Sequence, residues 1–391
     1  MSSVVLSNVN QSNEAEINAK VQRRLDKMAA DWSNLPKEHK LRKFSEGLGD
    51  MLENAGYNEM YGIELKAPEG DQPAAHTTLI VLQKFLRANV DDLDKAKDQL
   101  LHALKWRKEY QPLKVRDEMF DAEKFGKLGY VTKVKGATET PNDEDVATFN
   151  IYGAVGKDIK KTFGDTDAFV RWRVALQELT LRELHLEQAD KNIPDYGKGP
   201  DPYKSIAVHD YMSVSFFRQP AEIKASSSKI IDMFQRYYPE TVSYKYFVNV
   251  PLVMQWMMGA MKALMSKDSI QTMTWMTYGS ELHKYLGKEV PQEYGGSGPA
   301  LIETALTPKY GATSSETKPE AVPAATSENT AARAEEKKES EPATAGAAET
   351  QAVAPTTTEP IVAPTAAESA GPITDTTPEV TGKPEEKATV A

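Results

Sequence analysis

The amino-acid sequence predicts an α/β fold, with a helical N-terminal unit, then a mostly parallel β-sheet with flanking helices, and finally a disordered C-terminal tail. Three observations predict this organisation. Apolar residues recur with helical spacing up to about residue 110. From residue 129, short runs rich in β-branched and aromatic residues alternate with helical patterns, which is typical of a parallel sheet. Beyond Tyr310, the 391-residue chain contains no aromatic residue, no Leu and no Met.

The first predicted elements are helices within residues 1–75, a segment that we expect to be helical and partly disordered. Apolar residues recur with helical spacing over residues 19–52. Pro36 divides this run into two helices, because proline lacks the amide hydrogen that a helix interior needs. The sequence Pro-Glu-Gly-Asp at residues 68–71 predicts a turn before the next element.

The next segment, residues 76–115, is expected to form a helical N-lobe with two helices. Thr78 is the expected N-cap of the first helix, since its hydroxyl can accept a hydrogen bond from an amide of the first turn. Asp91 and Asp92 open the second helix, where their negative charge suits the positive end of the helix dipole. Both helices carry apolar residues along one face.

Residues 116–305 are predicted to form an α/β domain. Its expected strands are dense in β-branched and aromatic residues and cover residues 129–136, 146–155, 204–214, 244–251 and 272–278. Its expected helices cover residues 165–187, 220–237, 252–265 and 280–286. Residues 191–204 contain closely spaced Gly and Pro and therefore predict a long loop or insertion.

The acidic tail, residues 311–391, consists mainly of Ala, Thr, Pro, Glu and Ser. It carries 6 Lys and Arg against 14 Asp and Glu. Such a segment buries too little apolar surface to offset the entropy cost of ordering it, so we expect disorder. The tail accounts for most of the net charge of −10, and the rest of the chain is nearly neutral. This distribution argues against a nucleic-acid partner, which a dominant basic surface would favour.

Several classes of protein are excluded by composition. The chain contains no Cys, which excludes disulfides, thiolate metal sites, iron–sulfur clusters and cysteine nucleophiles, and which fits a reducing compartment. No apolar run approaches the roughly 20 residues of a membrane span. We therefore expect a soluble, intracellular protein. The sequence also lacks a phosphate-binding glycine loop, a Gly-x-Ser-x-Gly motif and a His-Glu-x-x-His pair.

One short motif, His209-Asp210-Tyr211, stands out within the third predicted strand. Residues two apart on a strand point to the same face, so His209 and Tyr211 project together and Asp210 projects to the other side. The residues alone leave two interpretations open. The pair can be a hydrogen-bonded part of the core. Alternatively it can contact a metal or cofactor, because tyrosinate is a known type of haem-iron ligand and a neighbouring His can orient it.

The predicted helix at residues 252–265 contains five Met and one Trp. It can be an ordinary core helix. Because Met side chains adapt to bulky and variable apolar partners, the helix can equally be one that moves over the mouth of a pocket or touches lipid. Gly259 in its middle favours the second interpretation.

Three segments together resemble the CRAL-TRIO lipid-binding family, which includes the fungal phosphatidylinositol-transfer proteins. They are residues 85–107 (FLRANVDDLDKAKDQLLHALKWR), 237–251 (YYPETVSYKYFVNVP) and 294–296 (YGG). The resemblance covers about residues 75–300. It implies a helical N-terminal unit, a mostly parallel sheet that forms the floor of a large apolar pocket, and a gating helix, which falls at residues 252–265.

The resemblance also suggests how a phosphatidylinositol headgroup is recognised. Glu240 matches the family's acidic residue near the inositol headgroup. The family's headgroup lysine aligns with Thr274, so a bound phosphate would lack that cationic partner, and contacts between charged groups are the strong ones.

A narrower resemblance links this chain to the non-classical fungal branch, whose members bind haem as well as phosphatidylinositol. It rests on the segments VATFNIYGAV, FVRWRVALQE, VHDYMSVSFFR and SYKYFVNVP. This resemblance implies haem b as cofactor, with Tyr211 as the axial iron ligand and His209 beside it as a possible second contact. It also implies that Tyr152, Arg173 and Lys245 line the same pocket. Taken singly, Arg173 and Lys245 can also be solvated, and Tyr152 can be a core aromatic residue.

The expected function is therefore that of a non-catalytic carrier or sensor. The resemblance implies a phosphatidylinositol-transfer protein that binds haem b in a hydrophobic pocket through a tyrosinate ligand and that acts in lipid signalling or in an oxidant stress response. It is expected in the cytoplasm, with transient peripheral contact to endoplasmic reticulum (microsomal) membranes. Phosphatidylinositol or another hydrophobic ligand is the expected partner. Two alternatives are lipid transfer of the classical type without haem and a haem-dependent enzyme that handles oxidants.

Overall fold

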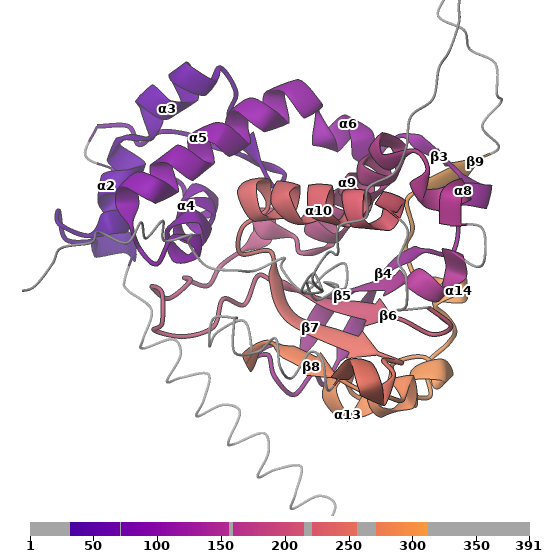
Figure 1. The fold of residues 1–391 in the computed structure, drawn as a ribbon. Coiled ribbons are helices and arrows are strands. Elements are labelled where there is room, and N and C mark those ends of the chain that lie inside the picture. The colour runs from indigo at the N-terminus through magenta and orange to yellow at the C-terminus, as the bar shows by residue number, and fades with distance from the viewer. Residues whose placement is uncertain (1–31, 71, 156–158, 215–220, 256–270, 312–391) are drawn as a thin grey trace, which may run out of the picture. The chain divides into compact units, whose positions relative to one another are not determined.

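The computed structural model describes residues 32–70, 72–155, 159–214, 221–255 and 271–311 (Figure 1). The predicted tail beyond Gly311 and residues 256–265 of the predicted gating helix lie outside the described residues. Residues 252–255, where that helix was expected to begin, are helical. No helix in these ranges is long and apolar enough to cross a membrane.

The N-terminal half of the described chain is mainly helical, as predicted. Its elements are η1 (Trp32–Asn34), α2 (Lys40–Glu46), α3 (Leu48–Ala55), β1 (Glu59–Met60), β2 (Ile63–Glu64), α4 (His76–Ala88), α5 (Leu93–Tyr110) and α6 (Pro112–Arg116). The two helices expected in residues 76–115 are thus confirmed as α4 and α5. Asp92 is the N-cap of α5 and accepts a hydrogen bond from the amide of Lys95 at 3.2 Å.

The predicted N-cap of α4 is wrong. The helix begins at His76, and Thr78 is fully buried inside its first turn. The Thr78 hydroxyl accepts a hydrogen bond from the amide of Lys66, at 3.4 Å, and none is found from its own helix. Residues 76–88 are buried along almost the whole helix, so the position of Thr78 is decided by packing rather than by capping.

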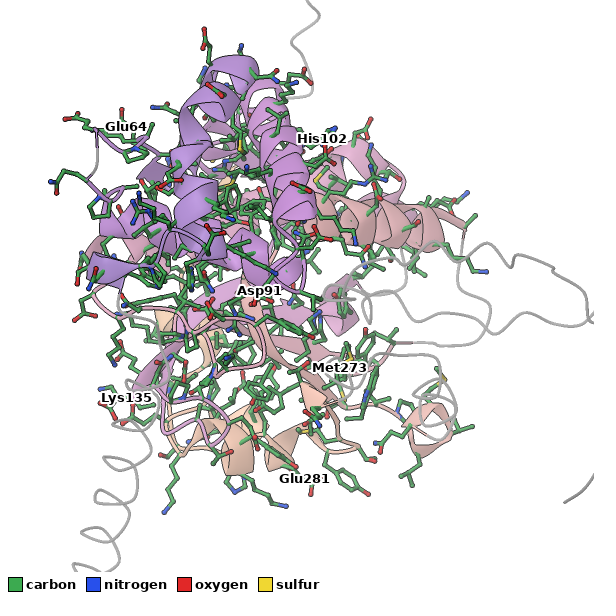
Figure 2. The ribbon with its side chains drawn as sticks, turned by 90° about the vertical axis from the view of Figure 1, so that its left-hand side faces the viewer. Glu64, Asp91, His102, Lys135, Met273 and Glu281 are labelled. Atoms are coloured by element: carbon green, nitrogen blue, oxygen red, sulfur yellow. The ribbon has the colours of Figure 1, made fainter. Side chains whose placement is uncertain are left out.

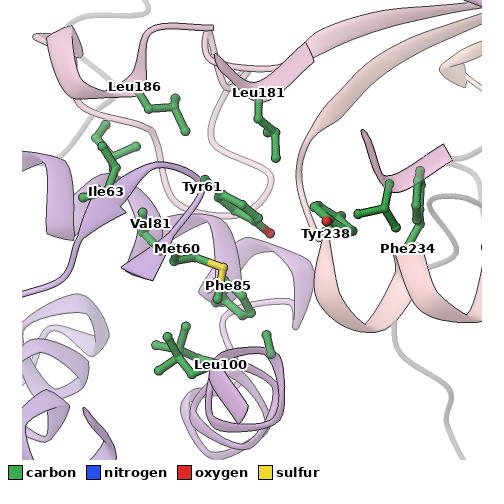
Figure 3. Close-up of a cluster of buried hydrophobic side chains, with 14 of the residues drawn as sticks. Met60, Tyr61, Ile63, Val81, Phe85, Leu100, Leu181, Leu186, Phe234 and Tyr238 are labelled. Atoms are coloured by element: carbon green, nitrogen blue, oxygen red, sulfur yellow. The ribbon is translucent and has the colours of Figure 1, made fainter. Parts of the chain in front are cut away.

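The helical half shares one hydrophobic core with the α/β half (Figure 3). Side chains from β1, α4 and α5, such as Met60, Phe85 and Leu100, belong to the same buried cluster as Leu181 of α9 and Phe234 of α10. Each such side chain contributes roughly 1.5–3 kcal/mol when fully buried. The two halves are therefore held together by a continuous apolar core.

The central sheet has five strands in the order β4-β5-β6-β7-β8, which confirms the five predicted strands. They are β4 (Gly129–Lys135), β5 (Glu144–Ile151), β6 (Ser205–Asp210), β7 (Val242–Val248) and β8 (Met273–Trp275). Only β4 and β5 are antiparallel, and the other neighbours are parallel, so the sheet is mostly parallel as predicted. The second strand ends earlier than predicted, at Ile151, and the chain continues as the 3-10 turn η2 (Tyr152–Val155).

Helices α9 (Thr166–Glu183) and α10 (Ala221–Tyr237) lie over one face of the sheet (Figure 1). The other face is covered by short C-terminal elements, namely η5 (Gly279–Glu281), α13 (His283–Leu286), η6 (Gln292–Tyr294) and α14 (Leu301–Thr304). Smaller connecting elements are α7 (Ala122–Phe125), α8 (Ile159–Phe163) and η3 (Leu186–Gln188). Residues 191–204 contain no helix or strand, as predicted.

Several short elements were not predicted, among them two strands that pair with each other. The strand β3 (Met119–Asp121) pairs in parallel with β9 (Lys309–Gly311), at the end of the described chain. Tyr310 of β9 accepts a hydrogen bond from the indole of Trp172 on α9 at 3.1 Å. These strands have three residues each, which is too short for a periodic pattern to be recognised in the sequence.

Candidate functional site

The third predicted strand, β6, places alternate side chains on opposite faces of the sheet. Ile206 and Val208 join the apolar cluster under the C-terminal elements, and the Asp210 carboxylate bonds Tyr294 on that side. His209 points to the opposite face, where its ring stacks on Phe247 at 5.1 Å between centroids. Tyr211 follows on the same side as His209. The predicted opposition of Asp210 to its two neighbours is thereby confirmed.

Tyr152 brings a second phenol to this face. Its hydroxyl lies 3.1 Å from Nδ1 of His209, and the two rings are nearly parallel, at an angle of 4°. The ring of Tyr152 also lies 5.1 Å from the ring of Tyr211. Tyr152 is the first residue of η2, just beyond the end of β5. Because β5 and β6 are parallel neighbours, Tyr152 lies beside the residues at the end of β6.

His209 is fully buried and neutral. Burial lowers the pKa of its imidazole well below the usual 6.5, and the positive charges of Lys245 and Arg173 lower it further. The Nε2 atom has no hydrogen-bond partner among the described residues. A buried imidazole nitrogen without a partner is costly, so it marks a position where a ligand can satisfy it.

Both cations named by the sequence are buried rather than solvated. Lys245 lies on β7 and is 1% exposed, and Arg173 lies on α9 and is 5% exposed. The guanidinium of Arg173 lies over the ring of Phe234, 5.3 Å from its centroid. Because both charges act on His209, the structure gathers the five predicted residues from η2, α9, β6 and its following turn, and β7.

Further members of this cluster were not predicted from the sequence. Phe247 stacks on Trp275 of β8 with a centroid distance of 3.8 Å, and it lies in the same buried group as Tyr211, Met254 and Met273. Met273 is labelled in Figure 2. Phe247 is two residues beyond Lys245, so strand alternation could have found it. Trp275 is found only through the register that pairs it with Phe247.

Glu240 lies elsewhere. It precedes β7, whereas the amide of Tyr211 bonds the carbonyl of Val248 at the other end of that strand. At about 3.3 Å per residue, the two ends of β7 are roughly 20 Å apart. The structure therefore does not bring Glu240 to the cluster formed by Tyr152, His209 and Tyr211, which we call the Tyr–His cluster. Thr274 pairs with Tyr246 in the middle of the neighbouring strand.

The Glu240 carboxylate is already paired with two cations. Its Oε2 atom lies 3.1 Å from Nε of Arg87 on α4 and 2.5 Å from Nζ of Lys204. Burial alone would raise the pKa of this carboxyl group, but Lys204 and Arg87 outweigh it and lower the pKa to about 2. Glu240 is thus ionised and links the N-lobe to the α/β domain.

Among the residues described by the structure, no group of three or more His, Asp or Glu side chains could hold a metal ion. A buried phenol and a buried imidazole are side chains of the types that ligate haem iron.

The CRAL/TRIO domain family matches residues 151–296. A solved structure described as "Crystal structure of Sfh5" has a TM-score of 0.58 and 28% sequence identity, and the alignment covers 72% of this chain and 95% of that chain.

Several curated relatives are similar over about two thirds of the chain. "Phosphatidylinositol transfer protein SFH5" of Phaeosphaeria nodorum is 48% identical over 266 residues, which is 68% of this chain and 78% of the relative. The sfh5 proteins of Sclerotinia sclerotiorum and Botryotinia fuckeliana are each 48% identical over 69% of this chain. The matches span 64% and 60%, respectively, of these two relatives, which is less than two thirds of their length.

Proposed function

Because this chain belongs to the CRAL/TRIO proteins, in the Sfh5 branch of fungal phosphatidylinositol transfer proteins, we propose that it is a non-catalytic lipid carrier that also binds haem b. The observation that supports the haem half is the buried cluster of Tyr152, His209 and Tyr211 with two cations beside it. The lipid half is supported by the family.

The described residues fit a haem group in three respects. Tyr211 is 3% exposed and offers a phenol oxygen, which an adjacent ferric ion and nearby cations would favour as tyrosinate. His209 offers an Nε2 atom that no described residue satisfies. The stacked rings of Phe247 and Trp275 supply a flat apolar surface.

In this proposal each side chain has a separate role. Tyr211 would hold the iron through its phenol oxygen, and His209 would be a second contact, which stays neutral because it is buried. Tyr152 orients His209 through the contact at 3.1 Å. Arg173 and Lys245 supply positive charge suited to propionate groups. When bound, haem would supply a redox-active ferric centre that responds to oxidants or to haem supply.

Apolar side chains at the carboxyl edge of the sheet support contact with membranes. Met212, Leu252, Val253 and Tyr278 follow β6, β7 and β8, and they are 56%, 71%, 53% and 67% exposed. Carboxyl ends of parallel strands lie at one edge, so we propose that this edge touches the bilayer. The location proposed is the cytoplasm, with peripheral association to endoplasmic reticulum membranes.

The headgroup role of Glu240 is a separate part of the proposal. An inositol hydroxyl would have to share a carboxylate that already binds Arg87 and Lys204. Those two cations can instead face the lipid phosphate in place of the lysine absent at Thr274. Headgroup binding at this end of β7 would leave the Tyr–His cluster at the other end available to haem.

An absorption spectrum of the untreated purified protein tests the haem half. We expect a Soret band, and Tyr211→Phe is expected to abolish or shift it. A colourless protein that does not take up added haemin would overturn this half. Transfer of labelled phosphatidylinositol between vesicles tests the lipid half, and transfer no faster than in the blank would overturn it.

A second candidate function is oxidant handling by the bound iron. The Nε2 atom of His209, which has no hydrogen-bond partner among the described residues, favours it, because in the tautomer with hydrogen on Nδ1 this nitrogen can accept a proton from an oxidant. Peroxidase turnover that His209→Gln abolishes, while the Soret band remains, would support this candidate over the carrier. Absence of turnover in the haem-loaded protein would exclude it.

A further inference from the structure

The Asp210 carboxylate forms a hydrogen-bonded hub directly behind the Tyr–His cluster. Asp210 is 7% exposed and is the last residue of β6. Its Oδ1 atom accepts hydrogen bonds from the amide of Met212 and from Nδ2 of Asn249, each at 2.8 Å. Its Oδ2 atom accepts one from the hydroxyl of Tyr294, also at 2.8 Å. Hydrogen bonds to a carboxylate are about twice as strong as those between neutral groups.

The three donors come from separate parts of the chain. Met212 belongs to the turn after β6, and Asn249 is the first residue after β7, with a positive φ of 58°. The Asn249 side chain also accepts a hydrogen bond from the amide of Gly279 at 2.7 Å, so it reaches the segment after β8. Tyr294 belongs to η6 on the opposite face of the sheet. The hub therefore joins the carboxyl ends of three parallel strands to the segment that covers their back.

Tyr294 is well suited to hold this hub in place. It is 2% exposed, and its ring packs 5.2 Å from the ring of Phe149 on β5. Burial raises the pKa of its phenol, and the charge of Asp210 raises it further. The hydroxyl thus keeps its proton and remains a donor to Asp210.

Tyr211 lies between two anchored neighbours. On one side of it, the Asp210 carboxylate accepts a hydrogen bond from the amide of Met212. The amide of Tyr211 itself donates to the carbonyl of Val248 at 3.1 Å. The carbonyl of Tyr211 accepts a hydrogen bond from the amide of Val214 at 3.0 Å. In addition, Ser213 in this turn adopts a positive φ of 64°, an uncommon conformation that the surrounding bonds must stabilise.

We propose that Asp210, held by Tyr294 and Asn249, is a positioning residue that aims the Tyr211 phenol at the bound ligand. This inference rests on the proposed haem function, because the ligand that needs a precisely placed phenol is iron. The residues on the face of the sheet that carries Tyr294 would thus fix the position of Tyr211 on the opposite face. Groups that orient a metal ligand typically contribute about 10- to 100-fold to metal affinity.

The test compares two buried tyrosines on the same face of the sheet. Tyr294→Phe removes the hydroxyl that binds Asp210 and keeps the ring. Tyr246→Phe is the matched control, since Tyr246 is 1% exposed and its hydroxyl has no hydrogen-bond partner in the described ranges. Asp210→Asn is the second variant, because an amide nitrogen cannot accept the bonds that the carboxylate accepts.

Two measurements are made on each full-length variant. We expect Tyr294→Phe and Asp210→Asn to release haem about 10- to 100-fold faster and to shift the bands of tyrosinate-bound iron, with Tyr246→Phe unchanged. In the haem-free protein, we expect faster hydrogen exchange at the Met212 amide in the first two variants only.

The outcomes separate this inference from the proposed function. If the unmodified protein holds haem and the Tyr294→Phe and Tyr246→Phe variants behave alike, the positioning role is overturned and haem binding stands. If the unmodified protein takes up no haem, the proposed haem function fails. In that case hydrogen exchange still decides whether Asp210 anchors the Tyr211 turn, and equal exchange in all variants rejects it.

Discussion

The hydroxyl of Tyr152 lies 3.1 Å from Nδ1 of His209, although 57 residues separate them in the chain. Their rings are nearly parallel, at 4°. Gly153 makes this arrangement possible, because a Cβ atom at that position would lie only 1.9 Å from the carbonyl oxygen of Met212. The close approach of the two backbones therefore decides where the Tyr152 ring sits.

Gly153→Ala is expected to push η2 away from the turn after β6 and to break the contact between Tyr152 and His209. Overpacking of this kind typically costs about 1–3 kcal/mol of unfolding free energy. Urea unfolding measures that loss, and the absorption spectrum of the haemin-treated protein is expected to change with it.

Gly49→Ala is the control for this substitution. Its added Cβ would meet only the Cβ of Ala67, at 3.7 Å, and Gly49 lies within α3. Alanine inside a helix is favoured over glycine by about 0.5–1 kcal/mol, so this variant should be as stable as the original protein or more so. Equal stability of the two variants would contradict the argument from close approach.

Arg107 is the centre of a buried ionic network between α5 and the α/β domain. Its guanidinium lies 2.8 Å from Glu59 and 2.7 Å from Glu178, and Tyr238 donates a hydrogen bond to Glu178 at 2.7 Å. Arg107→Met would leave these carboxylates without their cation, at a cost of about 3–5 kcal/mol in urea unfolding.

An exposed ion pair provides the comparison. Arg236 and Asp232 form a pair in which both side chains are about 60% exposed. Arg236→Met breaks this pair and should lower the free energy of unfolding by less than about 1 kcal/mol. If Arg107→Met cost no more than Arg236→Met, the network would not hold the two halves together.

The Glu240 carboxylate predicts a pH dependence of stability. Its pKa is about 2 in the folded protein, against 4.5 as the ordinary value. Since the folded state binds protons more weakly, the stability from Glu240 is complete above about pH 5 and is lost as the pH falls toward 2. This difference corresponds to at most about 3 kcal/mol.

Glu240→Gln removes this dependence. The unfolding free energy of the variant should be lower than that of the original protein at pH 6, and the gap should shrink toward pH 3. Glu281→Gln, which breaks an exposed pair with Lys284, serves as the control and should show no gap. A gap of constant size across this pH range would show that Glu240 contributes through packing alone.

The exposed apolar edge predicts how the protein binds vesicles. Replacing Leu252 and Val253 together by Asp is expected to weaken binding to phosphatidylinositol-containing vesicles about tenfold or more, because each buried methylene contributes about 0.8 kcal/mol. Ile302→Asp on α14 is the control, since that side chain is 66% exposed and follows none of the three strands at this edge. Equal losses in both variants would reject this edge as the docking surface.

Several elements could be predicted because they depend on local pattern. The five strands of the sheet follow from runs of β-branched and aromatic residues, and the shared face of His209 and Tyr211 follows from the alternation along a strand. Other expectations failed where distant contacts decide. Thr78 is enclosed by packing instead of capping a helix, and the strand expected to continue to residue 155 ends at Ile151.

The sequence alone predicted the order of the longer helices and strands and the face to which each strand residue points, because backbone periodicity acts over a few residues. The family followed from the resemblance of several segments. Which of those residues meet was decided only by the tertiary structure. The register of β7 against β6 and β8 puts Phe247 between His209 and Trp275, and the packing of α9 on the sheet brings Arg173 within reach of His209. Such contacts join residues far apart in the chain, so no local pattern encodes them.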